Sequence, residues 1–431
     1  MRVILPCMLL AVAGCSVPDL DLTGKACPCP EPGWRCFEAR CVQPLAGYPS
    51  CDEGGVYDIS AGDTVTCAVE CGALYCWGDN SWGQLAQDPD RRPNPAGGDD
   101  EIFGFAGSES PVRVGLRNDW AAVAVGYDHV CAIDDQKDTY CWGRNDLGQL
   151  GTGSDERLSF VPTIVTSFGN WDRVSTRSST TCGVRDGIVA CWGSDSCGLL
   201  GTGTFDGTPL NSPTAIVYDG EDDWADVAVG GNFVCALRGA GELWCWGCNM
   251  NGMLARSSFG MGLFSTPEPA ATDETFAQLA SGQEHGCGLS TSGQTLCWGL
   301  NNSGRTGLGL EEGVTSMPTV VGTDYVALDA ESFGACGLTP DGRLDCWGQN
   351  IDGNVGVGPE TVMTFPTPRA TVGLPATVVD FSVGRLHTCA RSDDSILHCV
   401  GLDQDGQLGT GTTARRNLTY EPVLFAGSDT Q

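Results

Sequence analysis

The sequence predicts an all-β chain: a seven-bladed β-propeller of four-stranded antiparallel blades, preceded by a small cysteine-rich segment. A motif that begins Cys-Trp-Gly, or Cys-Val-Gly in its last copy, recurs about every 50 residues, and each copy follows another cysteine by nine or ten residues. The 431 residues include 61 glycines and 23 prolines, and no long helical pattern occurs. Short strands in a repeat of this length are typical of a ring of blades.

The recurring cysteines pair across a short hairpin. Between Cys182 and Cys191 the centre of symmetry falls on Asp186-Gly187, a two-residue turn signal. Counting outward places the two cysteines opposite each other in a pair whose Cα atoms lie about 4.5 Å apart, within disulfide reach. Zinc binding is the alternative, but zinc sites usually use paired CxxC knuckles or clustered histidines, and the single CxxC, from Cys245 to Cys248, has no second one to pair with. The seven predicted disulfides join Cys67 with Cys76, Cys131 with Cys141, Cys182 with Cys191, Cys235 with Cys245, Cys287 with Cys297, Cys336 with Cys346 and Cys389 with Cys399.

A tryptophan follows the second cysteine in six of the seven copies. Because side chains alternate between the two faces of a strand, this tryptophan faces the neighbouring blade and belongs to the core. A platform for stacking carbohydrate is the functional alternative. The six residues are Trp77, Trp142, Trp192, Trp246, Trp298 and Trp347, and Val400 takes their place in the last copy.

The N-terminus predicts export. Arg2 precedes an apolar run from Val3 to Ala13, and Val-Ala-Gly comes directly before Cys15. This arrangement is typical of a secretory signal, and the run is too short to span a bilayer. Its ending resembles the bacterial lipoprotein signal, which implies removal of residues 1–14 and lipidation of Cys15. An ordinary signal peptide with an incidental cysteine is the alternative.

The other cysteines suit a secreted protein, because 24 cysteines are typical of an oxidising compartment. Residues 15–50 are predicted to form a lipidated stalk too short for a core of its own, whose disulfide connectivity is open. Cys51 is expected to bond Cys71, and Cys197 to bond Cys248 between neighbouring blades. The propeller is assigned to 51–427 and a tail to 428–431. The stalk cysteines are Cys27, Cys29, Cys36 and Cys41.

Two further features depart from the repeat. The first copy is followed by an insertion from Ala86 to Ser110 that carries Ile102, Phe103 and Phe105. It is either a binding loop or a tolerated insertion on one face. The segment Glu421 to Leu424 resembles a spare Pro-x-x-Val strand, and we expect it to complete the first blade.

Catalytic signatures are missing from the sequence. His129, His285 and His387 recur at one repeat position, which favours local hydrogen bonding over a catalytic group, and no nucleophile elbow, zinc helix or phosphate loop occurs. The sequence therefore predicts no enzyme, no cofactor and no metal site. A carboxylate pair across the channel and weak calcium binding at acidic loops stay open.

The repeats resemble those of the regulator of chromosome condensation family, over roughly residues 52 to 427. The shared pattern is C-x-L, a turn, then C-W-G-x-N-x-x-G-Q-L-G-x-G. The resemblance implies a closed propeller with seven blades. The guanine-nucleotide exchange of the family's founder is not expected of an exported, acidic chain. A secreted bacterial propeller of similar repeats inhibits β-lactamase, which supports a protein-binding role.

Together these patterns predict a binding or scaffold module anchored in the bacterial cell envelope, at the outer membrane. Its partner is expected to be a protein or a glycan. A net charge of −31 disfavours nucleic acid and anionic lipid, so the membrane is contacted only through the anchor. The alternatives are an inhibitor or regulator of a secreted enzyme and an envelope hydrolase with a site at the channel mouth. The oligomeric state and the leaflet are open.

Overall fold

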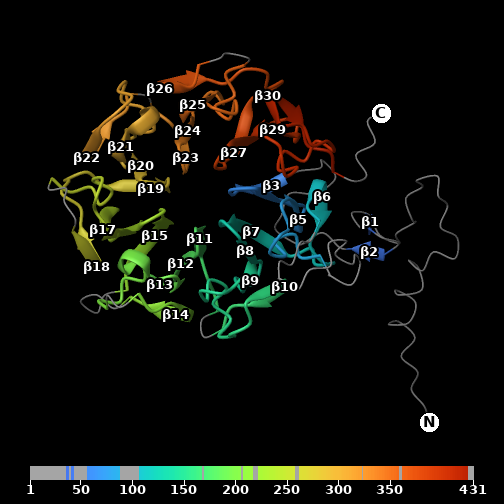
Figure 1. The fold of residues 1–431 in the computed structure, drawn as a ribbon, viewed down its shortest axis with the longest axis horizontal. Helices are drawn as coiled ribbons and strands as arrows, with labels where there is room; N and C mark the ends of the chain where they lie inside the picture. The colour runs from blue at the N-terminus through green and yellow to red at the C-terminus, as the bar shows by residue number, and fades with distance from the viewer. Residues whose placement is uncertain are drawn as a thin grey trace, which may run out of the picture.

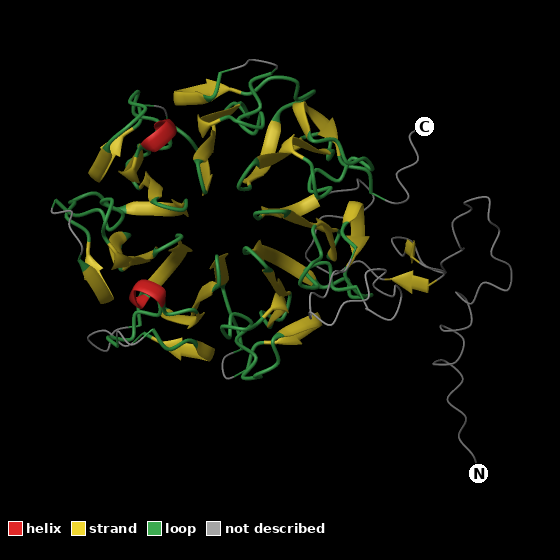
Figure 2. Ribbon diagram, viewed as in Figure 1, coloured by secondary structure: helices red, strands yellow, loops and turns green. Residues whose placement is uncertain are grey.

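The computed structural model describes residues 35–37, 40–42, 56–87, 106–166, 169–204, 207–216, 222–257, 262–322, 324–358 and 362–425. Seven four-stranded antiparallel sheets stand side by side around a central channel (Figures 1 and 2). The predicted fold class is confirmed. No helix within these ranges is long and apolar enough to span a bilayer.

Each blade uses four consecutive strands, which run in chain order from the channel to the rim. Blades 1 to 4 comprise β3 (Val56–Ala61), β4 (Val65–Glu70), β5 (Ala73–Gly78) and β6 (Ser108–Arg113); β7 (Trp120–Val125), β8 (His129–Asp134), β9 (Thr139–Arg144) and β10 (Leu158–Ile164); β11 (Arg173–Arg177), β12 (Thr180–Arg185), β13 (Ile188–Gly193) and β14 (Leu210–Ala215); β15 (Trp224–Val229), β16 (Phe233–Arg238), β17 (Glu242–Cys248) and β18 (Leu263–Pro269).

The remaining three blades repeat this order. They comprise β19 (Phe276–Ser281), β20 (His285–Ser290), β21 (Thr295–Leu300) and β22 (Val314–Val320); β23 (Ala327–Glu331), β24 (Gly334–Leu338), β25 (Leu344–Gln349) and β26 (Thr364–Ala370); β27 (Val378–Val383), β28 (His387–Ser392), β29 (Leu397–Leu402) and β30 (Arg416–Pro422). Two 3₁₀ turns, η3 (Ser196–Gly198) and η4 (Asn302–Gly304), and a hairpin of β1 (Arg35–Phe37) and β2 (Arg40–Val42) complete the described elements.

The prediction that the last strand completes the first blade was wrong. β30 pairs with β29 inside blade 7, and blade 1 has its own outer strand, β6. The proline-containing strand follows the cysteine hairpin of its own blade, so no blade lacks one. The ring is instead closed by contacts between complete blades: Ala61 N–H donates to Ser382 Oγ at 3.0 Å, and Arg385 pairs with Asp63 at 3.0 Å.

The hairpin disulfides join the predicted pairs. In each blade the two cysteines are register partners on the second and third strands, and their Cα atoms lie 4.1 Å apart, slightly closer than hairpin geometry led us to expect. The bonds are Cys67 to Cys76, Cys131 to Cys141, Cys182 to Cys191, Cys235 to Cys245, Cys287 to Cys297, Cys336 to Cys346 and Cys389 to Cys399.

The cysteines outside this repeat are described only in part. Cys197 and Cys248 are bonded between blades 3 and 4, as predicted. Cys71 is also disulfide-bonded, while its predicted partner Cys51 lies outside the described residues. The predictions for Cys15, Cys27 and Cys29 likewise fall outside these residues. The backbones of Cys36 and Cys41 are register partners in the β1–β2 hairpin.

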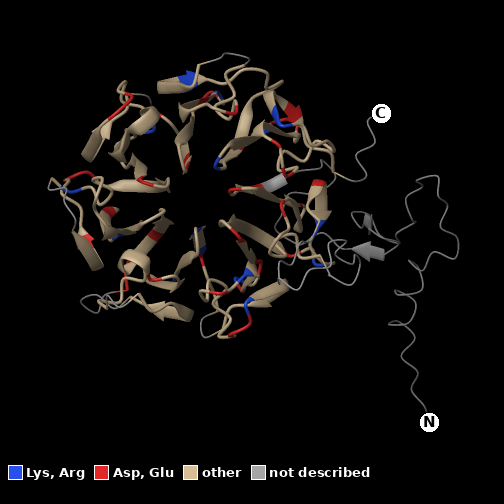
Figure 3. Ribbon diagram, viewed as in Figure 1, with Lys and Arg blue, Asp and Glu red and all other residues tan. Residues whose placement is uncertain are grey.

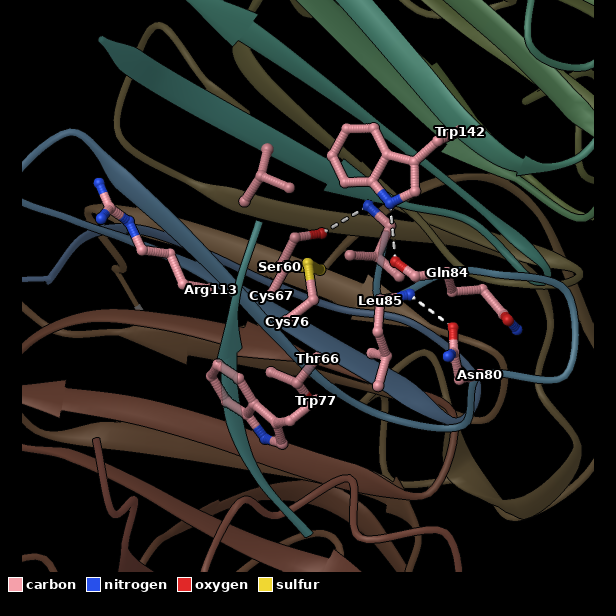
Figure 4. The surroundings of a disulfide bond; sticks show 12 residues. Ser60, Thr66, Cys67, Cys76, Trp77, Asn80, Gln84, Leu85, Arg113 and Trp142 are labelled. Carbon is pink, nitrogen blue, oxygen red and sulfur yellow. Dashed lines mark hydrogen bonds between the residues drawn. A yellow bond between two sulfur atoms is a disulfide. The ribbon is translucent and has the colours of Figure 1, made fainter. Parts of the chain in front are cut away.

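Each of the six tryptophans is buried at the joint with the preceding blade. Its indole N–H donates to a backbone carbonyl in the connection between the third and fourth strands of that blade, as Figure 4 shows for Trp142 and Gln84. The six bonds measure 2.7 to 3.1 Å and are Trp77 to Gln407, Trp142 to Gln84, Trp192 to Gln149, Trp246 to Leu199, Trp298 to Met253 and Trp347 to Arg305.

The same connection is shaped by one asparagine or aspartate side chain. In blade 1, Asn80 Oδ1 accepts the backbone N–H of Leu85 at 2.9 Å (Figure 4), and all seven blades have this bond. A glycine further along keeps the space for the indole. At Gly151, whose φ is +65°, an added Cβ would lie 2.6 Å from Trp192 Nε1. The repeated motif therefore encodes a joint between two blades.

The joint between blades 6 and 7 differs because Val400 replaces the tryptophan. The ring of Tyr420 from β30 fills the corresponding space beside Gly356. The carbonyl of Asn354 accepts the hydroxyl of Thr388 at 2.7 Å, a bond that Thr66 and Thr181 also make at their joints in addition to the indole. The Tyr420 hydroxyl is buried and has no hydrogen-bond partner among the described residues. The substitution preserves packing but loses one hydrogen bond.

We predict that Trp246→Phe lowers the stability of the propeller by about 1–3 kcal/mol, because the buried carbonyl of Leu199 loses its donor. Differential scanning calorimetry of the full chain in detergent measures the change as a lower melting temperature.

Tyr420→Phe serves as the matched control. It removes a hydroxyl that has no partner within the described part of the chain, so its melting temperature should equal or exceed that of the parent. Equal melting temperatures for the parent and both variants would contradict a contribution of the indole hydrogen bond to stability.

Candidate functional site

The central channel contains two cavities. The larger, of about 440 Å³, is lined by the inner strands of all seven blades, which are β3, β7, β11, β15, β19, β23 and β27. The smaller, of about 250 Å³, lies among the connections that follow these strands. Both are lined in part by Arg177 and Glu331, so these two side chains stand between them.

Arg177 and Glu331 occupy one repeat position that is glycine in the other five blades. The position lies at the end of the inner strand, or directly after it in the blades that have glycine there, and it faces the residue two places before the hairpin cysteine. The seven pairs are Gly62 with Val65, Gly126 with His129, Arg177 with Thr180, Gly230 with Phe233, Gly282 with His285, Glu331 with Gly334 and Gly384 with His387.

Close approach of a ring explains most of these glycines. A Cβ on Gly282 would lie 2.1 Å from His285 Cε1, and one on Gly230 would lie 2.2 Å from Phe233 Cε1. Blades 3 and 6 have no ring at the opposite position, because Thr180 and Gly334 stand there. The small partner leaves room for a long side chain, and both blades place a charged one in it.

Arg177 forms an ion pair with Glu331 across the channel. Its Nε donates to the carbonyl of Val229 at 3.1 Å, and its Nη2 donates to the carbonyls of Ser281 at 2.5 Å and Ala330 at 3.1 Å. The Arg177 side chain is only 7% exposed. One guanidinium thereby binds blades 4, 5 and 6 to blade 3. We call the Arg177–Glu331 pair the channel lock.

The smaller cavity is bordered by aromatic and arginine side chains from several blades. Tyr127 is 47% exposed, and Phe333 is half-buried beside the Arg305 and Arg385 guanidiniums, 5.3 and 5.9 Å from its ring centre. Arg385 bonds both carboxylate oxygens of Asp63, whose charge raises the pKa of Tyr127. We call this end of the propeller the mouth face.

Strand direction assigns the other connections to faces. In a sheet of four antiparallel strands, the first and third connections leave from the same end, so the described parts of the β5–β6 connection, residues 79–87 and 106–107, lie at the mouth face. The insertion with Ile102, Phe103 and Phe105 is part of that connection, but these three residues lie outside the described ranges. The start of β3 pairs with the hairpin-tip end of β4, Val56 opposite Glu70, so the chain enters the propeller at the opposite face.

Several carboxylates line the larger cavity, and acidic positions lie on strands around the channel (Figure 3). Asp58 accepts the backbone N–H of Val123 at 2.6 Å, and burial, with the nearby Asp380, raises its pKa to about 7. Burial also raises the pKa of Asp380 to about 6 and that of Glu331 to about 7. Asp329 accepts the N–H of Val383 at 2.7 Å, and its pKa is likewise raised by burial.

The three recurring histidines lie between blades and line neither cavity. His129 Nε2 contacts Thr181 Oγ1 at 2.9 Å, and His387 Nε2 contacts Thr66 Oγ1 at 2.8 Å. Each threonine hydroxyl donates onward to a backbone carbonyl. Burial lowers the pKa of His129 to about 3 and that of His387 to about 4, so both rings are neutral. His129 and His387 thus make the predicted local hydrogen bonds, whereas neither ring nitrogen of His285 has a hydrogen-bond partner among the described residues.

The channel lock was missed by the sequence analysis, although a signal for it existed. Aligning the seven copies on their cysteines places Arg177 and Glu331 in a column of glycines. Within the described part of the chain, no group of three or more His, Cys, Asp or Glu residues could hold a metal ion.

Comparison with known families identifies the repeat. Residues 103–429 match the model of the RCC1-like domain, and residues 72–133 match the regulator of chromosome condensation (RCC1) repeat. The chain belongs to the RCC1-like domain family. The RCC1-like domain match covers most of the propeller, from the end of the blade 1 insertion to the last blade.

The RCC1-like propeller of this chain resembles parts of longer curated proteins. The ultraviolet-B receptor UVR8 of Arabidopsis thaliana is 27% identical over 241 residues, 55% of this chain and 51% of that protein. The probable E3 ubiquitin-protein ligase HERC4 of Rattus norvegicus is 29% identical over 370 residues, 80% of this chain and 32% of that protein. The chain thus spans about half or less of these relatives, both of which are eukaryotic.

A solved structure shows the same fold. Prp20p from Saccharomyces cerevisiae superposes with a TM-score of 0.71 at 18% identity, covering 88% of this chain and 89% of that one. Its structure is described together with its binding properties to Gsp1p and histones.

The prediction that the chain is no enzyme was wrong, because neither the repeats nor the missing motifs exclude an enzyme. The similarity to HERC4 extends over 370 residues, so RCC1-like repeats occur within a protein named as a probable ligase. Missing hydrolase and phosphate-binding motifs therefore do not exclude enzymatic activity.

We predict that the channel lock is strongly coupled. Arg177→Gly leaves Glu331 buried without its partner and should destabilise the protein by about 3–5 kcal/mol. The double variant of Arg177→Gly with Glu331→Gly restores the glycine of the other five blades, so its loss should be well below the sum of the two single losses. A double-mutant cycle of urea unfolding measures the coupling, and additive losses would contradict a lock.

We predict that stability falls as the pH rises from about 4 to 7. The native pKa of Asp58, at about 7, exceeds its ordinary value of 3.8, so the folded state holds the proton more tightly and loses this stabilisation as the carboxyl ionises. Asp58→Asn keeps an oxygen for Val123 and removes the titration. Its melting temperature should therefore vary less between pH 5 and pH 7.5 than that of the parent, and parallel curves would contradict the prediction.

Proposed function

We propose that this chain is an envelope-anchored binding module whose mouth face docks a protein partner. The observation that carries the proposal is the composite border of the smaller cavity, where Asp63, Tyr127, Phe333 and Arg385 from blades 1, 2, 6 and 7 meet. Tyrosine, tryptophan and arginine dominate the binding energy of protein interfaces. Trp82 and Arg144 add a tryptophan and a further arginine to the mouth face. The Arg144 guanidinium lies 4.3 Å from the centre of the Trp82 ring.

The family supports a protein partner. Prp20p, which shares the fold, is described with binding properties to Gsp1p and histones. The partner of the present chain is expected to differ, because site residues rather than the fold determine what is bound. A net charge of −31 would speed association with a basic protein surface and oppose nucleic acid.

The anchor and the mouth would lie on opposite sides of the propeller. The chain enters β3 at the face opposite the mouth, so a lipid on Cys15 and a stalk over residues 15–50 would leave the mouth face pointing away from the membrane. Eight disulfides within the described residues are typical of an oxidising compartment. We place the protein in the cell envelope, at the outer membrane.

Two narrower functions remain within this proposal. If the docked protein is a secreted enzyme, the module acts as its inhibitor or regulator. The larger cavity favours a second candidate, an envelope hydrolase, because Asp58 and Asp380 interact and have pKa values raised to about 7 and 6. A carboxyl that stays protonated near neutral pH is suited to general acid catalysis.

The test is capture of a partner from native envelope by the full chain in detergent, compared with the double variant of Tyr127→Ser with Phe333→Ser. The matched control combines Val326→Ser with Ile396→Ser, whose parent side chains are 56% and 44% exposed near the opposite face. A protein retained by the parent and the control, and reduced at least tenfold with the mouth variant, is the expected result.

Equal capture by all three proteins would contradict docking at the mouth face. Loss of the captured species after glycosidase treatment would indicate a glycan in place of a protein. Turnover of a glycoside or ester substrate that Asp58→Asn abolishes would favour the hydrolase.

A further inference from the structure

The disulfide between Cys197 and Cys248 differs from the seven hairpin disulfides in the elements that it joins. Each hairpin disulfide links the second and third strands of one blade through cysteines that are 9 or 10 residues apart. Cys197 and Cys248 are 51 residues apart, and their bond connects the turn η3 of blade 3 to the last residue of β17 in blade 4. We call this bond the staple.

The staple also lies where reagents can reach it more easily. Every hairpin cysteine is at most 2% exposed and is held in register between two antiparallel strands, so its blade has to open before a reagent can attack it. Cys197 is half-buried and belongs to a short turn rather than to a strand. Local opening of a surface turn costs much less free energy than opening a sheet. We therefore expect the staple to react before the hairpin disulfides.

Blade 5 shows that the turn does not need the disulfide. Its turn η4 occupies the same place in the repeat, and Ser303 stands where Cys197 stands in η3. The two residues have nearly the same backbone conformation, with φ values of 62° and 64°. In both cases the tryptophan of the next blade donates its indole N–H to the connection that contains the turn. Opening the staple should therefore leave the turn and the fold intact.

The joints that follow blades 3 and 5 can be compared directly. Gly203 N–H of blade 3 donates to the carbonyl of Ser265 in blade 4 at 2.8 Å. Gly309 N–H of blade 5 makes the equivalent bond to the carbonyl of Pro366 in blade 6 at 2.7 Å. The first joint carries the staple in addition to this hydrogen bond, whereas the turn of the second has Ser303 in place of a cysteine. Loss of the staple should therefore loosen the first joint and leave the second unchanged.

We propose that the staple is a redox-sensitive device, which dithiols open in the folded protein while the hairpin disulfides persist, so that the joint between blades 3 and 4 loosens. One thiolate of the dithiol attacks the Cys197 sulfur and forms a mixed disulfide, and Cys248 leaves as a thiolate that takes a proton from water. The second thiolate of the dithiol then displaces Cys197, which is protonated in turn. The dithiol is oxidised to its disulfide, and the staple is reduced by two electrons.

Stepwise reduction of the full chain in detergent tests the selectivity. The folded protein is incubated with increasing dithiothreitol at pH 8, free thiols are alkylated, and the labelled cysteines are identified by mass spectrometry. We expect labelling of Cys197 and Cys248 at a dithiothreitol concentration at least tenfold below the one that labels Cys182 and Cys191, the hairpin pair of blade 3. Labelling of both pairs at the same concentration, or of the hairpin pair first, would overturn the proposal.

Hydrogen exchange tests whether opening the staple changes the joint. It compares the oxidised protein with protein in which only the staple is reduced. Exchange of the Gly203 amide should be at least tenfold faster after reduction, and exchange of the Gly309 amide should stay the same. An unchanged rate at Gly203, or equal acceleration at both glycines, would overturn the proposal.

The double variant of Cys197→Ser with Cys248→Ser reproduces the opened state without a reagent. It should melt about 3–5 °C below the oxidised parent, because the unfolded chain loses a cross-link over a long span. Dithiothreitol at the concentration that opens the staple should not lower its melting temperature further, and a further fall would contradict the selectivity. None of these outcomes affects docking at the mouth face, because partner capture is measured with the oxidised protein and with different variants.

Discussion

The hydrogen bond from each indole N–H to the preceding blade is the constraint on which the ring depends. The connection between the third and fourth strands packs against the next blade. Its buried carbonyl therefore needs a hydrogen-bond donor from within the protein. One asparagine or aspartate fixes its shape, and the tryptophan of the next blade then binds the carbonyl, as Trp142 binds Gln84. Cys-Trp-Gly-x-Asn-x-x-Gly-Gln-Leu therefore acts across two blades. Six such joints hold complete blades together, and the ring closes without exchanging a strand between its ends.

Departures from the repeat are compensated where they occur. Val400 removes the indole from the last joint, and the Tyr420 ring occupies the vacated space at the cost of a hydroxyl without a partner in the described chain. Arg177 and Glu331 replace glycines in blades 3 and 6, where the residues opposite are small enough to admit them. Each charge would be costly alone in this buried place, and each neutralises the other. The two substitutions are therefore tolerated because they occur together.

Local sequence rules made the single blade predictable, but they could not predict the contacts across the ring. The cysteine pairs follow from hairpin symmetry, since Asp186-Gly187 fixes the register that places Cys182 opposite Cys191. The strand order within a blade could not be predicted from the repeat alone. A proline-containing strand gives the same periodicity whether it comes before or after the cysteine hairpin. For this reason Glu421 to Leu424 was assigned to the wrong blade. The channel lock joins residues 154 positions apart, and only the closed ring brings them together.

The channel lock also separates the two cavities of the channel. Arg177 reaches three other blades, and the Arg177–Glu331 pair lies where the linings of the two cavities meet. The smaller cavity is bordered by aromatic and arginine side chains, whereas the larger one is lined by several carboxylates. The carboxylates that line the channel are held by backbone N–H groups of neighbouring inner strands, so their positions are fixed by the propeller itself.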